Sequence, residues 1–430
     1  MMRVLWIVNI ELPAISEKLG RSPNPLGGWL TGVLNKVIQD PEIHLTIVYP
    51  DALCTADFEK GQLSSNVDFV GFKELRTTPA NYETLKSVLR RIVAEVSPDL
   101  IHIHGTEYMH SCALAEIASH SVPTVLSIQG ILTPYYDFFL NGVPGRIRNR
   151  ITPGSLIRRD FLQYGMLSFK KRIRYEQKAM ESVDYIIGRT DWDRAYAGWM
   201  APQAAYRKCN ESLRDAFYTQ QWDYAQCEKN TLFASQSDSP IKGFHFLLRA
   251  LALARQQIPD IRLYAVGAEK NPKNLASPGH LNIYQQYIYQ LIREKHLEDH
   301  VVFLGKLSEQ DMVRQYKQAN VFVCPSSCEN SPNSLGEAML LGMPCIASDV
   351  GGISSLMSSG REGIIYRCDD VSLLAYYLTA MLQDPDTAAE YGRAARARAM
   401  VTHDRTANYQ TLLCIYREML ERKNGRGTQK

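Results

Sequence analysis

Short apolar runs alternate with longer amphipathic stretches along most of this sequence, and the alternation starts twice. This rhythm is typical of a parallel β-sheet covered by helices on both faces. The strand candidates of the first half are Val4–Val8, His44–Val48, Val67–Val70, Leu100–Ile103, Thr124–Ile128 and Tyr185–Ile187. Those of the second half are Thr231–Ala234, Arg262–Val266, Val301–Leu304, Val321–Cys324, Pro344–Ala347 and Gly363–Tyr366. The sequence therefore predicts two doubly wound α/β sheets in succession.

The length of 430 residues also favours two domains, because one hydrophobic core rarely extends so far. We place an N-terminal Rossmann-like domain at residues 1–210 and a second one at residues 211–405. Residues 406–430 form a C-terminal amphipathic helix and tail, and we expect this helix to pack back on the N-terminal domain. Ligands of open α/β sheets bind beyond the carboxyl ends of the strands. Two such domains facing each other would create a cleft, which is where we expect the chemistry.

Composition argues against several other classes of protein. The net charge is only +3, and no recognised nucleic-acid module is present, so we expect no nucleic-acid partner. The nine cysteines are odd in number and scattered singly, unlike a secreted disulfide framework. The apolar start is too short to span a membrane, and no later stretch reaches that length. We therefore expect a cytoplasmic protein, with a peripheral position on the inner membrane face left open.

The segment from Pro325 to Met339 carries the strongest motif. It follows a strand candidate and opens a helix whose expected first residue, Asn333 or Ser334, is a good N-cap type. Unpaired amides at such a helix start suit a phosphate or a sugar hydroxyl. Glu329 lies before the helix and Glu337 within it, and carboxylates accept hydrogen bonds from sugar hydroxyls. The alternative is a solvated loop charge and a glutamate on a helix surface.

This segment resembles the E-x7-E pattern of the retaining glycosyltransferase family 4, also called the group 1 glycosyltransferases. The run SLGEAMLLGMPCIASDVGG continues the resemblance. It implies a GT-B fold, in which two Rossmann-like domains face each other across a cleft. It further implies that Glu337 binds the ribose of a nucleotide-sugar donor and that Glu329 contacts the donor sugar as a catalytic residue. The amides of Asn333, Ser334 and Leu335 would face the sugar and its diphosphate.

Two further positions of the second domain fit the same family. Lys242-Gly243 lies at a strand-to-helix turn, where a lysine can act as a point charge for a diphosphate. Family members usually add an arginine about five residues earlier, but this chain has Ser235–Asp238 there. Arg189, from the first domain, is our candidate substitute. The run that ends at Leu307 matches a family loop that lines the nucleotide base.

The first domain offers weaker signals. Gly27 and Gly28 precede a helix and can form an anion nest, although an ordinary turn explains them as well. In the family this loop closes over the donor phosphates. His102 and His104 alternate along one strand and should point to the same side. Many relatives have a histidine where this chain has Gln129, which cannot titrate.

A basic and partly apolar segment covers residues 146–178. Basic side chains beside exposed apolar groups suit an anionic membrane surface. A lipid-linked acceptor would be presented at such a surface. A solvated helical face that also supplies core residues explains the composition equally well.

Together these residues and the resemblance predict a hexosyltransferase. The donor would be a UDP- or GDP-sugar and the acceptor a glycan or a lipid-linked sugar, in polysaccharide or lipopolysaccharide assembly. The resemblance implies front-face attack with retention of configuration, no metal ion and no cofactor beyond the donor itself. The alternatives are another GT-B sugar-nucleotide enzyme, such as an epimerase or hydrolase, and a catalytically idle sugar-nucleotide-binding subunit.

Overall fold

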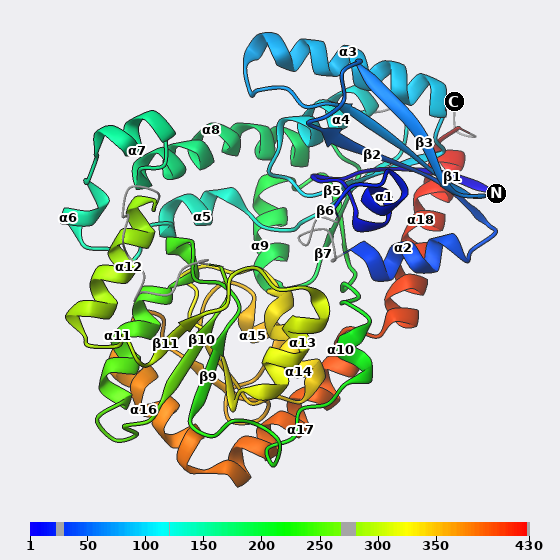
Figure 1. Cartoon of the computed structure of the whole chain (residues 1–430). Coiled ribbons are helices and arrows are strands. Elements are labelled where there is room, and N and C mark those ends of the chain that lie inside the picture. Colours follow the sequence, from blue (N-terminus) through cyan, green and yellow to red (C-terminus); the bar gives the residue numbers. More distant parts are fainter. Residues whose placement is uncertain (23–29, 120, 268–280, 428–430) are drawn as a thin grey trace. The chain divides into compact units, whose positions relative to one another are not determined.

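The computed structural model describes residues 1–22, 30–119, 121–267 and 281–427. The chain forms two compact units (Figure 1). The first unit comprises Met1–Leu132, Arg172–Arg214 and His403–Lys430, and the second comprises Thr133–Lys171 and Asp215–Thr402. Residues 133–171 thus group with the second unit, although their sequence position suggested the N-terminal domain. Hydrogen bonds explain this grouping, because the Asn141 carbonyl accepts from His245 at 3.0 Å and the Gly142 carbonyl from Arg249 at 3.1 Å.

The sheet of the first unit has the strand order β3-β4-β2-β1-β5-β6-β7-β8. All neighbouring strands are parallel except β3 and β4. The strands are β1 Met2–Ile7, β2 Ile43–Asp51, β3 Phe58–Ser64, β4 Val67–Lys73, β5 Leu100–His104, β6 Thr124–Ser127, β7 Tyr185–Gly188 and β8 Ala205–Lys208. The six strand candidates of the sequence are confirmed, whereas β3 and β8 were missed. Both lie at the sheet edges, and their polar side chains give no continuous apolar run.

Helices cover both faces of this first sheet. One buried cluster joins the sheet to α3, α4, α9 and the end of α8, and a second cluster joins it to α1, α2 and α18. Because α18 belongs to the last part of the chain, the C-terminus completes the core of the first unit (Figure 1). The helices are α1 Pro13–Lys18, α2 Thr31–Ile38, α3 Pro79–Val96, α4 Met109–Ala118, α8 Leu162–Glu181, α9 Asp191–Met200 and α18 Arg405–Gly427.

The second unit has a fully parallel sheet with the order β11-β10-β9-β12-β13-β14. Its strands are β9 Thr231–Ala234, β10 Arg262–Ala265, β11 Val301–Phe303, β12 Val321–Cys324, β13 Cys345–Ser348 and β14 Ile364–Tyr366. All six were predicted, because buried parallel strands read as short continuous apolar runs. The chain leaves β9 outward to β10 and β11 and then returns to place β12 on the other side of β9. The strand order therefore reverses between β9 and β12, which makes this gap the switch point of the sheet.

Helices of the second unit stand on both sides of its sheet (Figure 1). Helix α11 packs against α12 and α16, and α14 packs against α10, α13 and α17. These helices are α10 Ala216–Thr219, α11 Phe244–Ala254, α12 Ile283–Glu294, α13 Glu309–Gln318, α14 Asn333–Leu341, α15 Ile353–Leu356, α16 Val371–Gln383 and α17 Pro385–Thr402. The remaining helices of the unit are α5 Leu132–Phe138, α6 Gly145–Arg148 and α7 Pro153–Arg158, followed by the start of α8. None of the helices in the described ranges is both long and apolar enough to cross a bilayer.

Candidate functional site

Two residues singled out by the sequence meet at the switch point of the second sheet. Lys242 ends the short 3-10 turn Pro240–Lys242 after β9, and Glu329 lies in the loop after β12. The Lys242 Nζ atom is 2.7 Å from the Glu329 Oε1 atom. The Lys242 side chain is 26% exposed and that of Glu329 only 6%, so the lysine is the more accessible residue of the pair. The carboxyl ends of two neighbouring strands thus bring an acid and a base together.

The carboxylate of Glu329 is held by more than the lysine. Ser326 donates its hydroxyl to Glu329 Oε1 at 2.7 Å, and Ser348, at the end of β13, donates to the Ser326 carbonyl at 2.5 Å. Both serines are buried. Neither serine was predicted from the sequence, because a single serine at or after the end of a strand carries no distinctive pattern. Their hydrogen bonds fix the height of Glu329 above the sheet edge.

The electrostatic balance at this pair favours a charged lysine. Burial alone would lower the pKa of Lys242, but the negative charge of Glu329 and the hydrogen bond to it outweigh that effect and raise the pKa. The ammonium group therefore stays protonated across the physiological pH range. Its positive charge is suited to attract a second anion, such as a diphosphate.

Two glycines let neighbouring loops approach these residues closely. Gly351 has φ +53°, and a Cβ atom there would lie 1.8 Å from the Glu329 carbonyl oxygen. Gly243 has φ +66°, and a Cβ atom there would lie 1.8 Å from the Pro325 carbonyl oxygen. The Gly352 amide, in turn, donates to the Glu329 carbonyl at 3.1 Å. Only glycine combines this backbone conformation with such close contact.

Helix α14 begins at Asn333, one of the two predicted first residues. The expectation that Asn333 or Ser334 is the N-cap is wrong, because Pro332 occupies that position and no side chain caps the helix. The Leu335 amide donates to the Pro332 carbonyl at 3.0 Å, so this amide already has an internal partner. The amides of Asn333 and Ser334 belong to the first turn, where a helix supplies no carbonyl partner. Tyr316 anchors this turn by donating to the Ser334 carbonyl at 2.9 Å.

The other residues predicted for the second unit lie in neighbouring positions. Glu337 is buried within α14, eight residues after Glu329 along the chain. Leu307 is half-buried in the loop between β11 and α13. Cys324 and Cys328 are free and buried, and burial raises the pKa of each thiol to about 12. These two thiols are therefore structural neighbours of Glu329 and not reactive groups.

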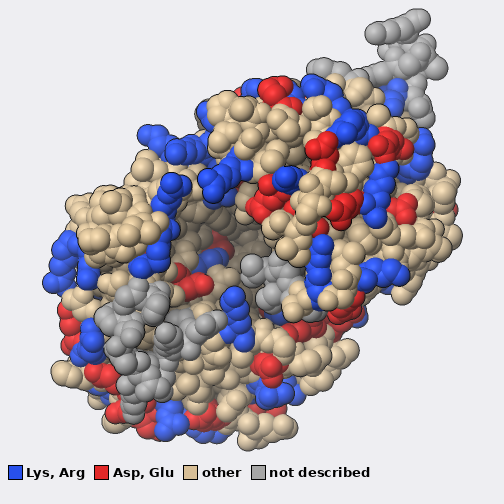
Figure 2. Space-filling model, turned by 45° about the horizontal axis from the view of Figure 1, so that its top comes forward, with Lys and Arg blue, Asp and Glu red and all other residues tan. Residues whose placement is uncertain are grey.

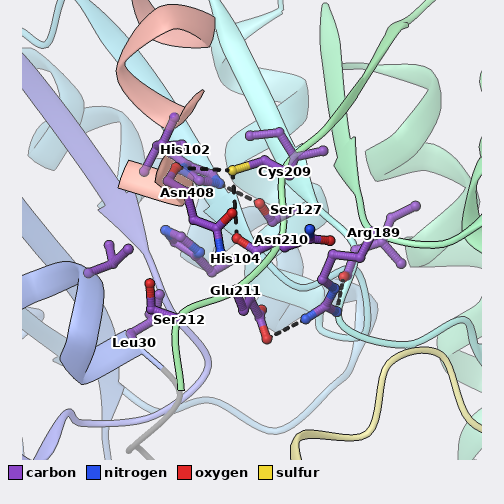
Figure 3. Close-up of a pocket in the computed structure, with 14 residues that line it drawn as sticks. Leu30, His102, His104, Ser127, Arg189, Cys209, Asn210, Glu211, Ser212 and Asn408 are labelled. Carbon is purple, nitrogen blue, oxygen red and sulfur yellow. Dashed lines mark hydrogen bonds and ion pairs between the residues drawn. The ribbon is translucent and has the colours of Figure 1, made fainter. Parts of the chain in front are cut away.

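In the first unit, Arg189 follows β7 and is buried. Figure 3 shows its guanidinium pointing toward the Glu211 carboxylate, with which it forms an ion pair. It also donates to the Ile128 carbonyl at 2.6 Å, and Gln129 donates to Glu211 at 2.8 Å. The Glu211 carbonyl accepts from the His403 ring at 2.8 Å. Arg189 thus has a structural role within the first unit, and its substitution for the missing phosphate arginine stays a prediction.

His102 and His104 lie on the same side of β5, as alternation predicted, and their rings stack with centroids 3.8 Å apart. Trp6 donates to the Tyr416 hydroxyl at 2.9 Å, and this hydroxyl lies 2.6 Å from His102 Nδ1. The buried Tyr416 must donate its own proton to that nitrogen, so His102 Nε2 carries the hydrogen and donates to Ser127 at 2.7 Å. Burial lowers the pKa of His102 to about 3, and burial together with the neighbouring His102 lowers the pKa of His104 well below its usual value, so both rings are neutral.

A cavity of about 50 Å³ opens beside these histidines, bordered by His104, Ser127, Arg189 and Glu211 (Figure 3). This space admits a few water molecules but no sugar ring. The remaining predicted residues of the first unit, Gly27 and Gly28, lie outside the described residues.

The part of the chain that carries the motif matches a known family. Residues 221–398, less than half of the chain, match the family described as "Glycosyl transferases group 1". These residues contain β9, β12, α14 and the pair formed by Lys242 and Glu329. This part of the second unit is thus similar to a group 1 glycosyltransferase domain.

Curated relatives of this group 1 domain include a D-inositol 3-phosphate glycosyltransferase of Pseudarthrobacter chlorophenolicus, 30% identical over 160 residues. That match covers 37% of this chain and 36% of the relative. A phosphatidyl-myo-inositol mannosyltransferase of Mycobacterium leprae is 26% identical over 194 residues, which are 45% of this chain and 47% of the relative. The chain thus spans less than half the length of these relatives.

Solved structures extend the likeness to the whole chain. Sucrose-phosphate synthase of Thermosynechococcus elongatus superposes with a TM-score of 0.71 over 98% of this chain and 100% of its own, at 18% identity. Anabaena HepE in complex with UDP-glucose gives a TM-score of 0.66 over 97% and 100%, at 17% identity. At such identities the likeness establishes the fold, which is GT-B, as the sequence resemblance implied.

Proposed function

We propose that this protein transfers a hexose-type sugar from a nucleoside-diphosphate sugar to an acceptor hydroxyl, with retention of configuration. The observation that carries the proposal is the pairing of Lys242 with Glu329 at the switch point of the second sheet, beside the first turn of α14. Doubly wound sheets bind their ligands at this place. A partly exposed lysine side chain, a helix start and two buried carboxylates suit an anionic, hydroxyl-rich ligand.

The donor is a UDP- or GDP-sugar in this proposal. Glu337 accepts hydrogen bonds from the ribose hydroxyls, and the loop that contains Leu307 lines the base. The first two amides of α14, from Asn333 and Ser334, face the sugar and the diphosphate. The Leu335 amide contributes less, because it already donates to the Pro332 carbonyl. The UDP-glucose complex of Anabaena HepE, which has the same fold, supports this class of donor.

The chemical step needs a positive charge close to the departing diphosphate. Lys242 supplies it, helped by the positive end of α14. Glu329 contacts the donor sugar and holds it against the acceptor hydroxyl. The front-face route sends the proton of that hydroxyl to the leaving phosphate oxygen, so no titrating side chain is required on that face. Gln129, which donates to Glu211 and does not titrate, is compatible with this route.

We propose a glycan or a lipid-linked sugar as the acceptor, in polysaccharide or lipopolysaccharide assembly. One relative of the group 1 domain has a name that includes a phosphatidyl-inositol acceptor, which supports the lipid-linked class. The basic and apolar segment of residues 146–178 points in the same direction.

One observation favours a second candidate function, a sugar-nucleotide-binding subunit without turnover. The family's phosphate arginine is replaced here by the stretch that contains Ser237, whose hydroxyl donates to the Val266 carbonyl at 2.8 Å. Ser237 is buried and cannot supply the missing charge.

The decisive experiment combines binding with product analysis. A thermal-shift panel of UDP-, GDP- and ADP-sugars identifies the donor, because a ligand that prefers the folded state raises the unfolding temperature. Mass spectrometry of the products then follows, with and without glycan and lipid-linked acceptors. A new glycoside with the donor's anomeric configuration supports the proposal. Binding without any product supports the idle subunit, and an isomerised or hydrolysed donor supports an epimerase or hydrolase.

A further inference from the structure

Large apolar side chains are unusually exposed in one short part of the second unit. Within residues 151–167, Ile151, Leu156, Ile157, Tyr164 and Leu167 all face solvent. The exposed fractions of Ile151, Leu156 and Ile157 are 52%, 59% and 82%. Single exposed apolar residues are ordinary, but several within one short segment mark an interaction surface.

The same segment is strongly basic. Residues 145–171 contain seven basic side chains and one acidic side chain, which gives a net charge of 7 − 1 = +6. The acidic residue, Asp160, is already bonded to Arg158 at 2.6 Å. The basic residues are Arg146, Arg148, Arg150, Arg158, Arg159, Lys170 and Lys171.

Most of this charge is open to a partner. Within the described part of the chain, Arg150, Arg159, Lys170 and Lys171 have no carboxylate at ion-pair distance, and all four are exposed. Figure 2 shows lysine and arginine side chains along the face of the molecule on which α7 and α8 lie. Charges left unpaired in this way keep their full attraction for an anionic surface.

Local structure holds the apolar residues outward. Thr152 and Ser155 form a reciprocal capping box at the start of α7, with hydrogen bonds of 3.1 Å and 2.8 Å. Ser155 is buried, as are Ile147 before α7 and Leu162 after it. These contacts fasten the segment to the unit from both ends. Leu156 and Ile157 are therefore presented by an ordered helix, which reduces the entropy lost on binding.

We propose that residues 145–171, with α7 at their centre, dock the protein on an anionic lipid surface. The lysines and arginines bind the lipid headgroups, while Leu156 and Ile157 enter the boundary between headgroups and acyl chains. Both signals are needed, because neither charge alone nor one apolar anchor gives stable membrane binding. This inference goes beyond the proposed function, since binding to lipid requires no donor and no turnover. It also narrows the surface expected from sequence, residues 146–178, to a segment that belongs entirely to the second unit.

The test is cosedimentation of the full-length protein with vesicles, in the absence of nucleotide sugar. One vesicle type contains equal parts of phosphatidylcholine and phosphatidylglycerol, and the other contains phosphatidylcholine only. We expect binding to the anionic vesicles that weakens with salt. The pair Leu156→Ser and Ile157→Ser should lower the partition coefficient at least roughly tenfold, an order-of-magnitude value from the transfer of two such side chains. Arg150→Gln, Lys170→Gln and Lys171→Gln together should lower it by at least roughly tenfold.

Matched controls come from the same unit. Val401 is 77% exposed, and Val401→Ser removes an apolar side chain outside the segment. Arg314→Gln, Arg367→Gln and Arg393→Gln together remove the same number of exposed charges elsewhere. Both controls should bind like the wild type.

Three results would overturn the proposal. The first is equal binding of the segment variants and the controls, or no binding to anionic vesicles. The second is a change of oligomeric state in the Leu156→Ser and Ile157→Ser variant with no change in vesicle binding, which would make the segment a contact between copies of this chain. The third is binding of a soluble polyanion that competes fully with vesicles and is unchanged by Leu156→Ser and Ile157→Ser.

Discussion

The ammonium group of Lys242 lies 2.7 Å from the carboxylate of Glu329, although 87 residues separate the two along the chain. The strand order explains this pairing, because β9 and β12 are neighbours only after the chain has passed through β10 and β11. The glutamate is more deeply buried than the lysine. The lysine side chain therefore offers more exposed surface to a ligand than the glutamate side chain does.

We predict that Lys242 and Glu329 are energetically coupled. Each single replacement, Lys242→Met or Glu329→Gln, leaves a partner without its ion pair, whereas the double variant removes both. A double-mutant cycle on the free energy of unfolding should give a coupling of about 1–3 kcal/mol. Urea denaturation of the four proteins measures it, and additive effects would mean that the pair is not formed in solution.

Gly351 offers a test of the loop that supports Glu329. Gly351→Ala places a methyl group against the Glu329 carbonyl, whereas a Cβ atom added at Gly360, with φ +77°, would have nothing within 4 Å. Both variants carry the cost of a positive φ, about 1 kcal/mol. Gly351→Ala should lower the free energy of unfolding by at least about 2 kcal/mol more than Gly360→Ala does, and it should reduce turnover. Equal losses of stability in the two variants would show that the loops can separate without cost.

Arg189 should act first on stability. Arg189→Met leaves the Glu211 carboxylate without its ion-pair partner, and we expect a loss of about 3 kcal/mol in the free energy of unfolding. Adding Glu211→Gln should restore most of the lost free energy of unfolding. Donor affinity of the folded double variant then tests the phosphate role predicted from sequence. An affinity equal to that of the wild type would contradict that role.

The buried imidazoles predict how stability depends on pH. Burial lowers the pKa of His102 and His245 to about 3 and that of His110 and His403 to about 4. The unfolded chain binds protons near pH 6.5 while the folded protein does not, so stability should fall as the pH drops below about 6.5. His110→Gln keeps a donor for Asn9 but cannot titrate, and it should flatten the decline. Unfolding midpoints between neutral and acidic pH measure this, and a midpoint that stays constant or rises on acidification would contradict it.

The sequence predicted the second unit better than the first, for a physical reason. The central strands β9, β12 and β13 are short and fully buried, so each appears as one apolar run in the sequence. Edge strand β3 is part polar and antiparallel, and its pairing with β4 depends on contacts that no local pattern encodes. The transfer of residues 133–171 to the second unit has the same cause, since hydrogen bonds to α11 decide it.

The candidate site, too, was only partly predictable from the sequence. The positions of Glu329, Glu337 and Lys242 relative to strands and helix were readable, because motif spacing fixes them. The ion pair itself was not, since it depends on which strands become neighbours. The buried Ser326 and Ser348, and the internal partners of Arg189, were also beyond sequence reasoning.

Nucleotide-sugar binding at Glu329 and Glu337 is best tested by one comparison of variants. Donor affinity by titration calorimetry and turnover are measured for Glu329→Gln, Glu337→Ala and a control, Glu362→Gln, which replaces another buried carboxylate of the second unit. We predict that Glu337→Ala weakens donor binding roughly 10- to 100-fold. Glu329→Gln should leave binding nearly intact and lower turnover roughly 100-fold or more, and the control should change neither. Wild-type donor affinity and turnover in both site variants would show that these two carboxylates do not bind the donor.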